Sequence, residues 1–314
     1  MRHLITLDDI SVEELNHILN LSTTIKSDLK RGVRRTPLDG KMMAMIFEKQ
    51  SLRTRVSFET AMFQLGGSSM FLGSDVGFGK REATKDFSEV LSSMVDVIMF
   101  RALRHESVAE MAKYATCPVI NALTDQAHPC QALADVMTIK EVFGTTQGLK
   151  IAWIGDANNV AVSLVRAAAK LGIAVSVAAP VGYQFEPGME AKLGGKSPVD
   201  GFSLEMTDDP AVAVAGAHAV YTDVWVSMGQ ESEEAERKKI LAPYHVDANL
   251  MKKARKDAIF LHCLPARRGQ EVTDEVMDSP QSRIVQQSEN RLHSQKGLLV
   301  WLLTASPPDA FAPK

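Results

Sequence analysis

The sequence predicts a two-domain α/β protein whose strands form parallel sheets. At 314 residues, the chain exceeds the length at which a single hydrophobic core usually stops growing. Short apolar runs alternate with amphipathic helical patterns along the chain, which is typical of parallel sheets covered by helices. A break at Gly144 to Gly148 separates two such series. We therefore expect one domain over residues 1–143 and another over 149–285, with a C-terminal helix in 286–314 that packs back on the first domain.

The first series begins with the run Lys41 to Phe47, which is apolar after its first residue and predicts a buried strand. Further strands are expected at 68–72, 96–101 and 117–121. Helical patterns flank or separate these strands near 10–30, 53–65, 84–95, 105–115 and 129–143.

The second series opens with a strand from Leu149 to Gly155, followed by a helix around Val160 to Leu171. Strands are expected at 173–179, 217–224 and 258–263, and helices near 208–216, 231–241 and 247–254. A last amphipathic segment, about 296–304, has no strand after it and is therefore the element expected to return to the first domain.

Composition and charge narrow the range of partners. The chain is 45% hydrophobic and 23% charged with a formal net charge of −3, which gives no reason to expect nucleic acid as a partner. The longest late apolar run, Leu298 to Leu303, is too short to span a membrane, and no signal-peptide core follows Met1. Three cysteines without metal-type spacing favour a reducing, cytoplasmic compartment.

Polar clusters follow the predicted strands at their carboxyl ends. In open α/β sheets, ligands bind at these ends because the loops gather there. Six clusters meet this condition, namely 51–55, Arg101, 124–131, 156–159, 223–229 and 262–267.

The first cluster, Ser51-Leu52-Arg53-Thr54-Arg55, lies between a strand and a helix. Backbone N–H groups and the helix dipole favour an anion at such a position, and arginines and hydroxyls add donors suited to phosphate. A capped helix with solvated arginines explains the same residues. On this stretch alone, both interpretations stay open.

Arg101 and His128 are further candidates in the first half. Arg101 is a charged residue at the end of a strand that is expected to be buried on both faces. Such a residue indicates either a ligand-binding site or the rim of the sheet. Pro129 suits a first helical turn, so His128 and Gln131 would cluster at a helix start. A histidine there is biased towards its neutral form and can donate to a carbonyl oxygen, although a lone histidine is usually structural.

The second half offers polar groups but no dinucleotide motif. Gly155-Asp156-Ala157-Asn158-Asn159 follows a strand, yet it lacks the G-x-G-x-x-G pattern of a dinucleotide site. Asn159 is expected to bind a polar small molecule or to cap the helix. Asp223 places a carboxylate at a strand end, and Cys263 is either an inert small hydrophobe or a polarisable contact for a reacting amine.

Together these clusters resemble the ornithine carbamoyltransferases, in the same order and at similar intervals over essentially the whole chain. The resemblance rests on Ser51 to Arg55, His128-Pro129-Cys130-Gln131, Asp223 with Ser227-Met228-Gly229, and His262-Cys263-Leu264-Pro265. The Ser-Met-Gly sequence and the cysteine distinguish this pattern from the aspartate carbamoyltransferases.

The resemblance implies two Rossmann-like domains, one for carbamoyl phosphate and one for L-ornithine, without a metal or organic cofactor. It implies direct attack by the ornithine side-chain amine through a tetrahedral intermediate, giving citrulline and phosphate, in a homotrimer or a multiple of trimers with sites at subunit interfaces. The carbamoyl-phosphate residues carried over are Ser51, Leu52, Arg53, Thr54, Arg55, Arg101, His128, Gln131, Cys263, Leu264 and Arg291. The ornithine residues are Asn159, Asp223, Ser227 and Met228, and the catalytic residues are Arg101, His128, Asp223 and Cys263.

Two positions depart from the family pattern. Leu52 replaces a threonine of the phosphate loop, which matters only if the hydroxyl and not the backbone N–H is used. Gly77 stands where many relatives carry a glutamine that reaches the neighbouring subunit, and Lys80 or Arg81 is a candidate substitute. The alternatives to ornithine transfer are another amine acceptor such as putrescine or an N-acylated ornithine, a non-catalytic homologue, and an NAD-dependent dehydrogenase.

Overall fold

The computed structural model describes residues 1–79, 81–193, 199–226 and 230–304. The chain forms two compact units, one from Met1–Met137 with Glu289–Lys314 and the other from Thr138–Ser288. Two helices, α5 (Pro129–Phe143) and α12 (Ile284–Leu303), carry the chain from one unit to the other. Within the described ranges, no helix combines the length and the apolar character needed to cross a membrane.

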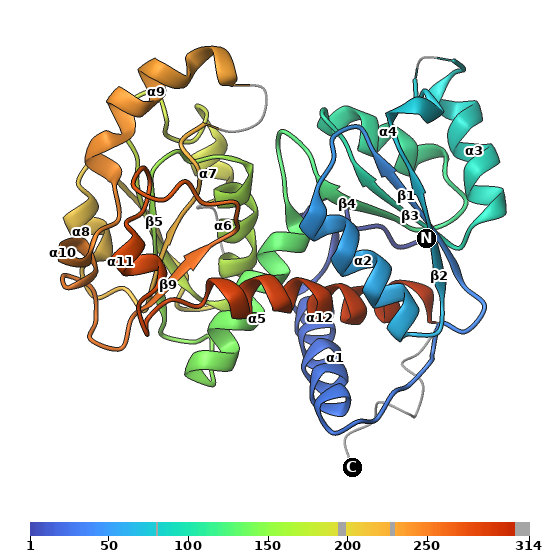
Figure 1. Ribbon diagram of the computed structural model, residues 1–314, viewed down its shortest axis with the longest axis horizontal. Helices are drawn as coiled ribbons and strands as arrows, with labels where there is room; N and C mark the ends of the chain where they lie inside the picture. Colours follow the sequence, from blue (N-terminus) through green and yellow to red (C-terminus); the bar gives the residue numbers. More distant parts are fainter. Residues whose placement is uncertain (80, 194–198, 227–229, 305–314) are drawn as a thin grey trace. The chain divides into compact units, whose positions relative to one another are not determined.

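The first unit contains a parallel sheet in the order β2-β1-β3-β4 (Figure 1). The four predicted strands are confirmed, although the last one starts two residues later than expected, after Pro118, which has no N–H for the ladder. The strands are β1 (Met42–Phe47), β2 (Ser68–Leu72), β3 (Val97–Arg101) and β4 (Val119–Leu123). The helices are α1 (Val12–Lys30), α2 (Leu52–Gln64), α3 (Thr84–Met94) and α4 (His105–Tyr114), with 3-10 turns at Leu7–Asp9 and Ser74–Val76.

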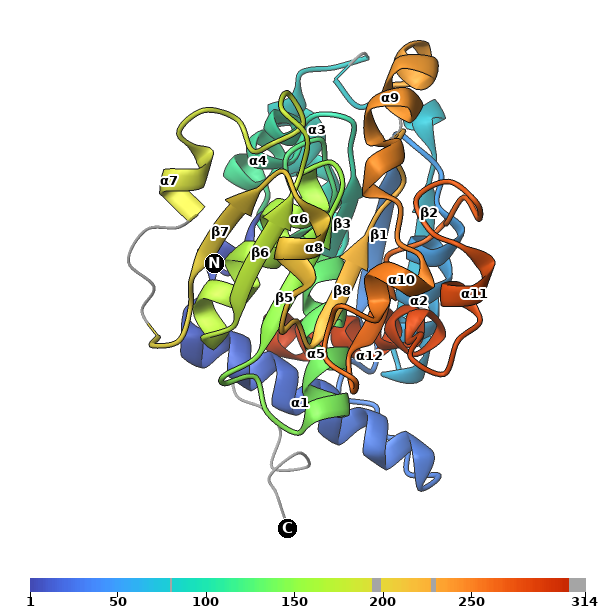
Figure 2. The ribbon, with the colours of Figure 1, turned by 90° about the vertical axis from the view of Figure 1, so that its left-hand side faces the viewer.

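The second unit contains a five-stranded parallel sheet in the order β7-β6-β5-β8-β9, of which β7, β6, β5 and β8 are labelled in Figure 2. Its strands are β5 (Lys150–Ile154), β6 (Ala174–Ala178), β7 (Leu204–Thr207), β8 (Ala219–Thr222) and β9 (Ile259–His262). Its helices are α6 (Asn159–Leu171), α7 (Met189–Leu193), α8 (Pro210–Val214), α9 (Glu234–Leu241), α10 (Ala248–Met251) and α11 (Asp274–Met277), with 3-10 turns at Glu231–Glu233 and Ala242–Tyr244.

Both sheets reverse their strand order beside the first strand of the unit. In the first unit the reversal lies between β1 and β3, whose last residues, Phe47 and Arg101, are paired. In the second unit it lies between β5 and β8, and Thr222 of β8 pairs with both Ile154 and His262. Such reversals open a crevice at the carboxyl ends of the strands, where ligands bind. The register therefore gathers the residues that follow these strand ends.

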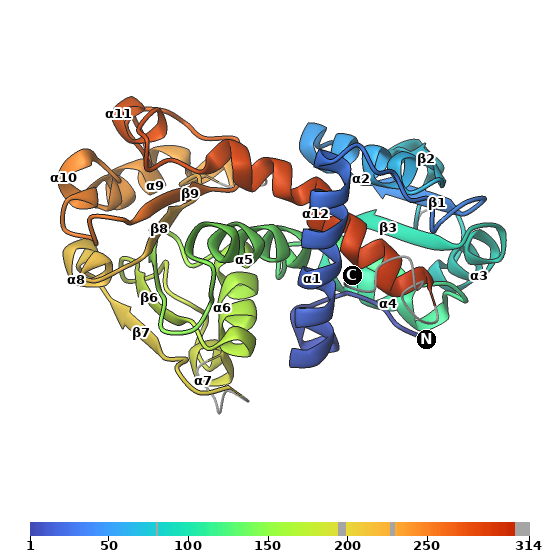
Figure 3. The same cartoon turned by 90° about the horizontal axis from the view of Figure 1, so that it is seen from below.

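The C-terminal helix is longer than the amphipathic segment predicted at 296–304. Its earlier turns carry buried polar side chains, so they show no apolar stripe in the sequence. As predicted, its later part packs within the first unit, where Asn290 accepts a 2.6 Å hydrogen bond from Lys26 of α1. Helix α12 crosses α1 (Figure 3), and a Cβ on Gly297 of α12 would be 2.1 Å from the Oγ of Ser22 in α1. Only glycine allows this close approach.

Candidate active site

Ser51 begins the first polar cluster and caps α2. Its backbone is extended, with φ −154°, and its Oγ accepts a hydrogen bond from the Thr54 backbone N–H. Leu52 is the first helical residue and its side chain points into solvent, with 76% of its surface exposed. The capped-helix interpretation is therefore correct as local structure. It is also compatible with an anion site, because the remaining N–H groups of the first turn have no partner within the helix.

Thr54 is the buried polar group of this turn. Its Oγ1 accepts hydrogen bonds from the Ser51 Oγ at 3.1 Å and from Arg291 Nη2 at 2.8 Å. Arg291 comes from α12 and is itself buried. A guanidinium thus lies beside the start of α2 although 237 positions separate it from Thr54 in the sequence.

The two arginines of the cluster differ in their surroundings. Arg53 is half-buried in the first turn of α2. Arg55 is exposed, and its Nε donates to Glu59 at 2.9 Å while its guanidinium lies 4.3 Å from the centre of the Phe71 ring. Arg55 therefore contacts Glu59 and Phe71 and not the Ser51–Thr54 hydrogen bonds. Arg53 is the better placed of the two arginines to bind a ligand at the start of α2.

Arg101, His128 and Gln131 add a buried polar group to the same unit. Arg101 ends β3, and His128 immediately precedes α5. Burial, with the charges of Arg291 and Arg101, holds the pKa of His128 well below its usual value. The imidazole is therefore neutral near pH 7, in agreement with the sequence-based expectation. Gln131 donates from Nε2 to Asp135 at 2.8 Å, and its buried Oε1 has no hydrogen-bond partner in the described part of the chain.

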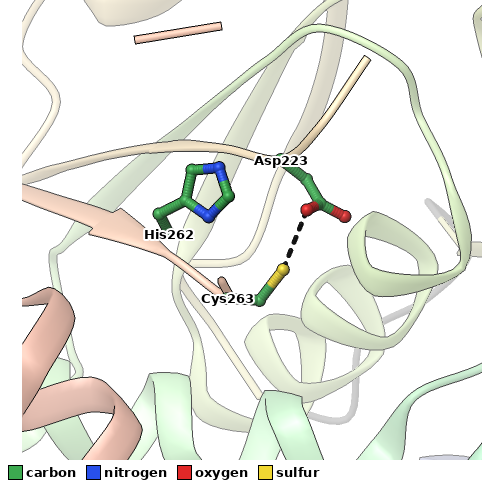
Figure 4. A group of neighbouring side chains, drawn as sticks. All are labelled: Asp223, His262 and Cys263. Atoms are coloured by element: carbon green, nitrogen blue, oxygen red, sulfur yellow. Dashed lines mark hydrogen bonds between the residues drawn. The ribbon is translucent and has the colours of Figure 1, made fainter. Parts of the chain in front are cut away.

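In the second unit, Asp223 is the centre of a hydrogen-bonded group. Its Oδ1 accepts from the Cys263 Sγ at 2.9 Å (Figure 4) and from the Val224 backbone N–H at 2.8 Å. Its Oδ2 accepts from Asn158 Nδ2 at 2.8 Å. Cys263 is partly exposed and bonded to a carboxylate, so the inert apolar alternative does not describe it.

The capping alternative for Asn159 was wrong by one residue. Asn158 is the N-cap of α6, because its Oδ1 accepts from the backbone N–H groups of Val160 and Ala161 at 2.9 and 3.2 Å. Asn159 is the first helical residue and is partly buried. Sequence reasoning missed that Asn158 also holds Asp223, since two adjacent asparagines give equal cap signals.

His262 is oriented by a buried carboxylate that the sequence analysis did not identify. The backbone N–H of Leu264 donates to His262 Nδ1 at 2.9 Å, and Nε2 lies 3.3 Å from Oε1 of the buried Glu271. Both ring nitrogens therefore have partners other than Cys263. Glu271 stands in a polar stretch without periodicity, so no sequence pattern marked it as buried. Leu264 adopts φ +59°, which is rare for a bulky residue and is often found at functional sites.

Asp223, His262 and Cys263 also offer one potential metal-ligand atom each within 4.8 Å of one another. Because His262 already pairs with Leu264 and Glu271 and the set has only three members, we assign no metal to it.

Gly77 has φ +71°, and a Cβ there would be 2.9 Å from Cγ of Arg81, so the Arg81 side chain occupies the space that a side chain at position 77 would need. Ser227, Met228 and Lys80 lie outside the described residues.

Comparison with known proteins supports the resemblance seen in the sequence. The family model for the carbamoyl-P binding domain of aspartate/ornithine carbamoyltransferase matches residues 2–141, and the model for its Asp/Orn binding domain matches residues 147–302. The chain belongs to the aspartate/ornithine carbamoyltransferase family. Residues 51–55 fall in the first matched range, and Asp223 and Cys263 fall in the second.

Individual relatives of this family member cover nearly its full length. Ornithine carbamoyltransferase from Anoxybacillus flavithermus is 52% identical over 300 residues, covering 95% of this chain and 96% of that protein. The Bacillus subtilis enzyme is 50% identical over 305 residues, covering 96% and 94%. The solved structure of ornithine carbamoyltransferase from Pyrococcus furiosus has a TM-score of 0.94 and 48% identity, covering 97% of this chain and 98% of that chain.

Proposed function

We propose that the protein transfers the carbamoyl group of carbamoyl phosphate to the side-chain amine of L-ornithine, releasing L-citrulline and phosphate. The observation that carries the proposal is the group formed by Asn158, Asp223 and Cys263. It places a carboxylate and a thiol at a strand end within the part of the chain that matches an Asp/Orn binding domain. The names of the relatives support ornithine as the acceptor.

Phosphate binding is assigned to the start of α2. Ser51, Arg53, Thr54 and the backbone N–H groups of the first turn that have no partner within the helix would hold the phosphoryl oxygens and neutralise the leaving phosphate. Because the side chain of Leu52 is exposed, Leu52 would contribute to phosphate binding only through its backbone N–H.

Stabilisation of the carbonyl oxygen is assigned to Arg101, His128 and Arg291. Negative charge develops on this oxygen as the tetrahedral intermediate forms, and preorganised donors lower the energy of that state. A neutral His128 can donate one hydrogen bond without adding a charge to the two arginines. The buried Oε1 of Gln131, which has no partner within the described residues, suits a hydrogen bond from the carbamoyl NH₂ group.

The amine must attack in its neutral form, although an alkylammonium has a reference pKa of about 10.4. Asp223 and Cys263 would orient the amine once its proton is lost, with Asn159, Ser227 and Met228 assigned to the amino-acid end. The amine attacks the carbonyl carbon, the C–O bond to phosphate breaks, and the proton from the nitrogen leaves with phosphate or solvent.

Citrulline formation from carbamoyl phosphate and ornithine by the purified protein tests the proposal. Arg53→Ala should abolish saturation by carbamoyl phosphate, with Arg55→Ala as the matched control, since Arg55 pairs with Glu59 and Phe71 instead. Wild-type saturation in Arg53→Ala would contradict the phosphate-loop assignment. Absence of both citrulline formation and citrulline arsenolysis in the wild type would favour a non-catalytic homologue.

We also propose a homotrimer, or a multiple of trimers, in a reducing cytoplasm. The outer face of α2 exposes Leu52, Val56 and Phe63, at 76%, 51% and 72% of their surfaces. Exposed apolar side chains on one helix face are typical of a surface covered in an assembly. The three free cysteines support the compartment. Light scattering on the purified protein measures the assembly, and a monomeric mass at micromolar concentration would contradict it.

A further inference from the structure

The first unit contains a basic cavity that none of the proposed catalytic residues lines. It has a volume of about 20 Å³ and lies among the end of α1, the connection that follows it, the end of α2, and α12. Its polar lining consists of Asp28, Arg34, Arg35, Gln64 and Lys296. The cavity is separate from the phosphate loop, because α2 runs for 13 residues between Ser51 and the cavity, roughly 20 Å along the helix.

Lys296 is an almost completely buried amine, with 1% of its surface exposed. An ammonium group has three N–H donors. In the part of the chain that the structure describes, Gln64 Oε1 is the acceptor for Lys296 Nζ. Burial and the charge of Arg34 lower the pKa of Lys296 to about 8. The amine is thus still largely protonated at pH 7, and two of its donors have no acceptor among the residues that the structure describes.

The carboxylate that lines the cavity does not neutralise these charges. Asp28 Oδ1 pairs with Arg31 at 2.5 Å, and its Oδ2 pairs with Arg35 at 2.8 Å. These arginines hold the pKa of Asp28 below its usual value, so its charge is already balanced. Arg34 has no ion pair or hydrogen bond with any side chain in the described ranges, and it faces Lys296 closely enough to disfavour the charge of that amine.

We propose that this cavity binds a small inorganic anion, a halide or phosphate, between the Lys296 amine and the Arg34 guanidinium. Among the described residues, a buried ammonium with donors that lack acceptors and a second cation without a side-chain partner line the same cavity, which matches what an anion requires. The anion would also tie the end of α1 to the ends of α2 and α12, and so it should stabilise the fold by mass action.

The test is thermal unfolding at constant ionic strength, with gluconate replaced stepwise by bromide in one series and by phosphate in another. The phosphate series uses an Arg53→Ala background, so that the proposed phosphate loop does not contribute. Arg34→Gln is compared with Lys30→Gln, which removes the same charge from an exposed residue that does not line the cavity. We expect a saturable rise in Tm for the wild type and for Lys30→Gln with at least one anion, and an apparent Kd at least tenfold weaker in Arg34→Gln.

A non-saturating rise, or the same response in both variants, would mean a general salt effect and would overturn the proposal. A flat response of the wild type to both anions would mean that water alone fills the cavity and would also overturn it. Lys296→Met should lose the response as Arg34→Gln does; because Lys296 is buried and its replacement can impair folding, the exposed Arg34 gives the deciding comparison.

Discussion

Replacing Cys263 by serine separates a positioning thiol from a covalent nucleophile. The Sγ of Cys263 donates to Asp223 Oδ1 at 2.9 Å. The neighbouring His262 uses Nδ1 for the Leu264 N–H and Nε2 for Glu271, so it is not arranged as a base for the thiol. This arrangement fits the proposed role, in which the Cys263 thiol positions the substrate amine.

The positioning role and the nucleophile role predict very different losses of activity in Cys263→Ser. A hydrogen bond between neutral groups, such as the Cys263 side chain and the neutral substrate amine, contributes about 0.5–1.5 kcal/mol, which is roughly 2- to 13-fold in rate or affinity. Serine keeps a donor towards Asp223, so we expect Cys263→Ser to lower kcat/KM for ornithine by about tenfold or less. Removal of a covalent nucleophile costs far more, on the order of 10⁶ in kcat where it has been measured in a serine protease.

The assay is steady-state citrulline formation at varied ornithine and saturating carbamoyl phosphate. Circular dichroism of the variant controls for folding. A folded Cys263→Ser protein with a kcat reduced by more than about 10⁴-fold would refute a positioning role, and so would a stoichiometric carbamoyl adduct on Cys263 in the wild type by mass spectrometry.

Three further predictions follow from the first unit. Leu52→Thr should change the KM for carbamoyl phosphate by less than about threefold, because the Leu52 side chain is exposed and only its backbone N–H is assigned to the ligand; a larger fall in KM would show that the hydroxyl matters. Thr54→Val removes the acceptor of the Arg291 hydrogen bond, and a bond to a charged group contributes about 1.5–3 kcal/mol, so kcat/KM should fall roughly 10- to 150-fold. Burial lowers the pKa values of His128 and His293, the latter from 6.5 to about 4. The unfolded chain therefore takes up more protons than the folded chain below about pH 6.5, and urea titrations should show the free energy of unfolding decreasing as the pH falls. The decrease should be smaller in a His293→Gln variant. Equal slopes of unfolding free energy against pH in the wild type and the variant would contradict this prediction.

Most strands of the fold were visible in the sequence because they are buried on both faces and therefore continuous apolar runs. The strand β7 was not predicted, since it is a four-residue edge strand, Leu-Glu-Met-Thr, that is only partly buried. The helices α7 and α11, which are five and four residues long, were also not predicted.

The residues of the candidate site were also predicted only in part from the sequence. Residues directly after strands, such as Asp223 and Cys263, were visible because parallel strands bring their carboxyl ends together. Asn158 and Glu271 were missed as partners, because each is recognised only by the side chain that it contacts in the folded chain. Arg291 came from the family resemblance alone. It lies in a buried polar stretch of α12 that has no amphipathic pattern.

The choice of acceptor tests the central proposal most directly. The measurement compares kcat/KM for L-ornithine, putrescine and an N-acylated ornithine, each at saturating carbamoyl phosphate. Carbamoyl transfer to the ornithine side chain, with kcat/KM at least a hundredfold above the other amines, is the predicted result. A preference for putrescine or N-acylated ornithine, or no carbamoyl transfer to any of the three, would contradict it.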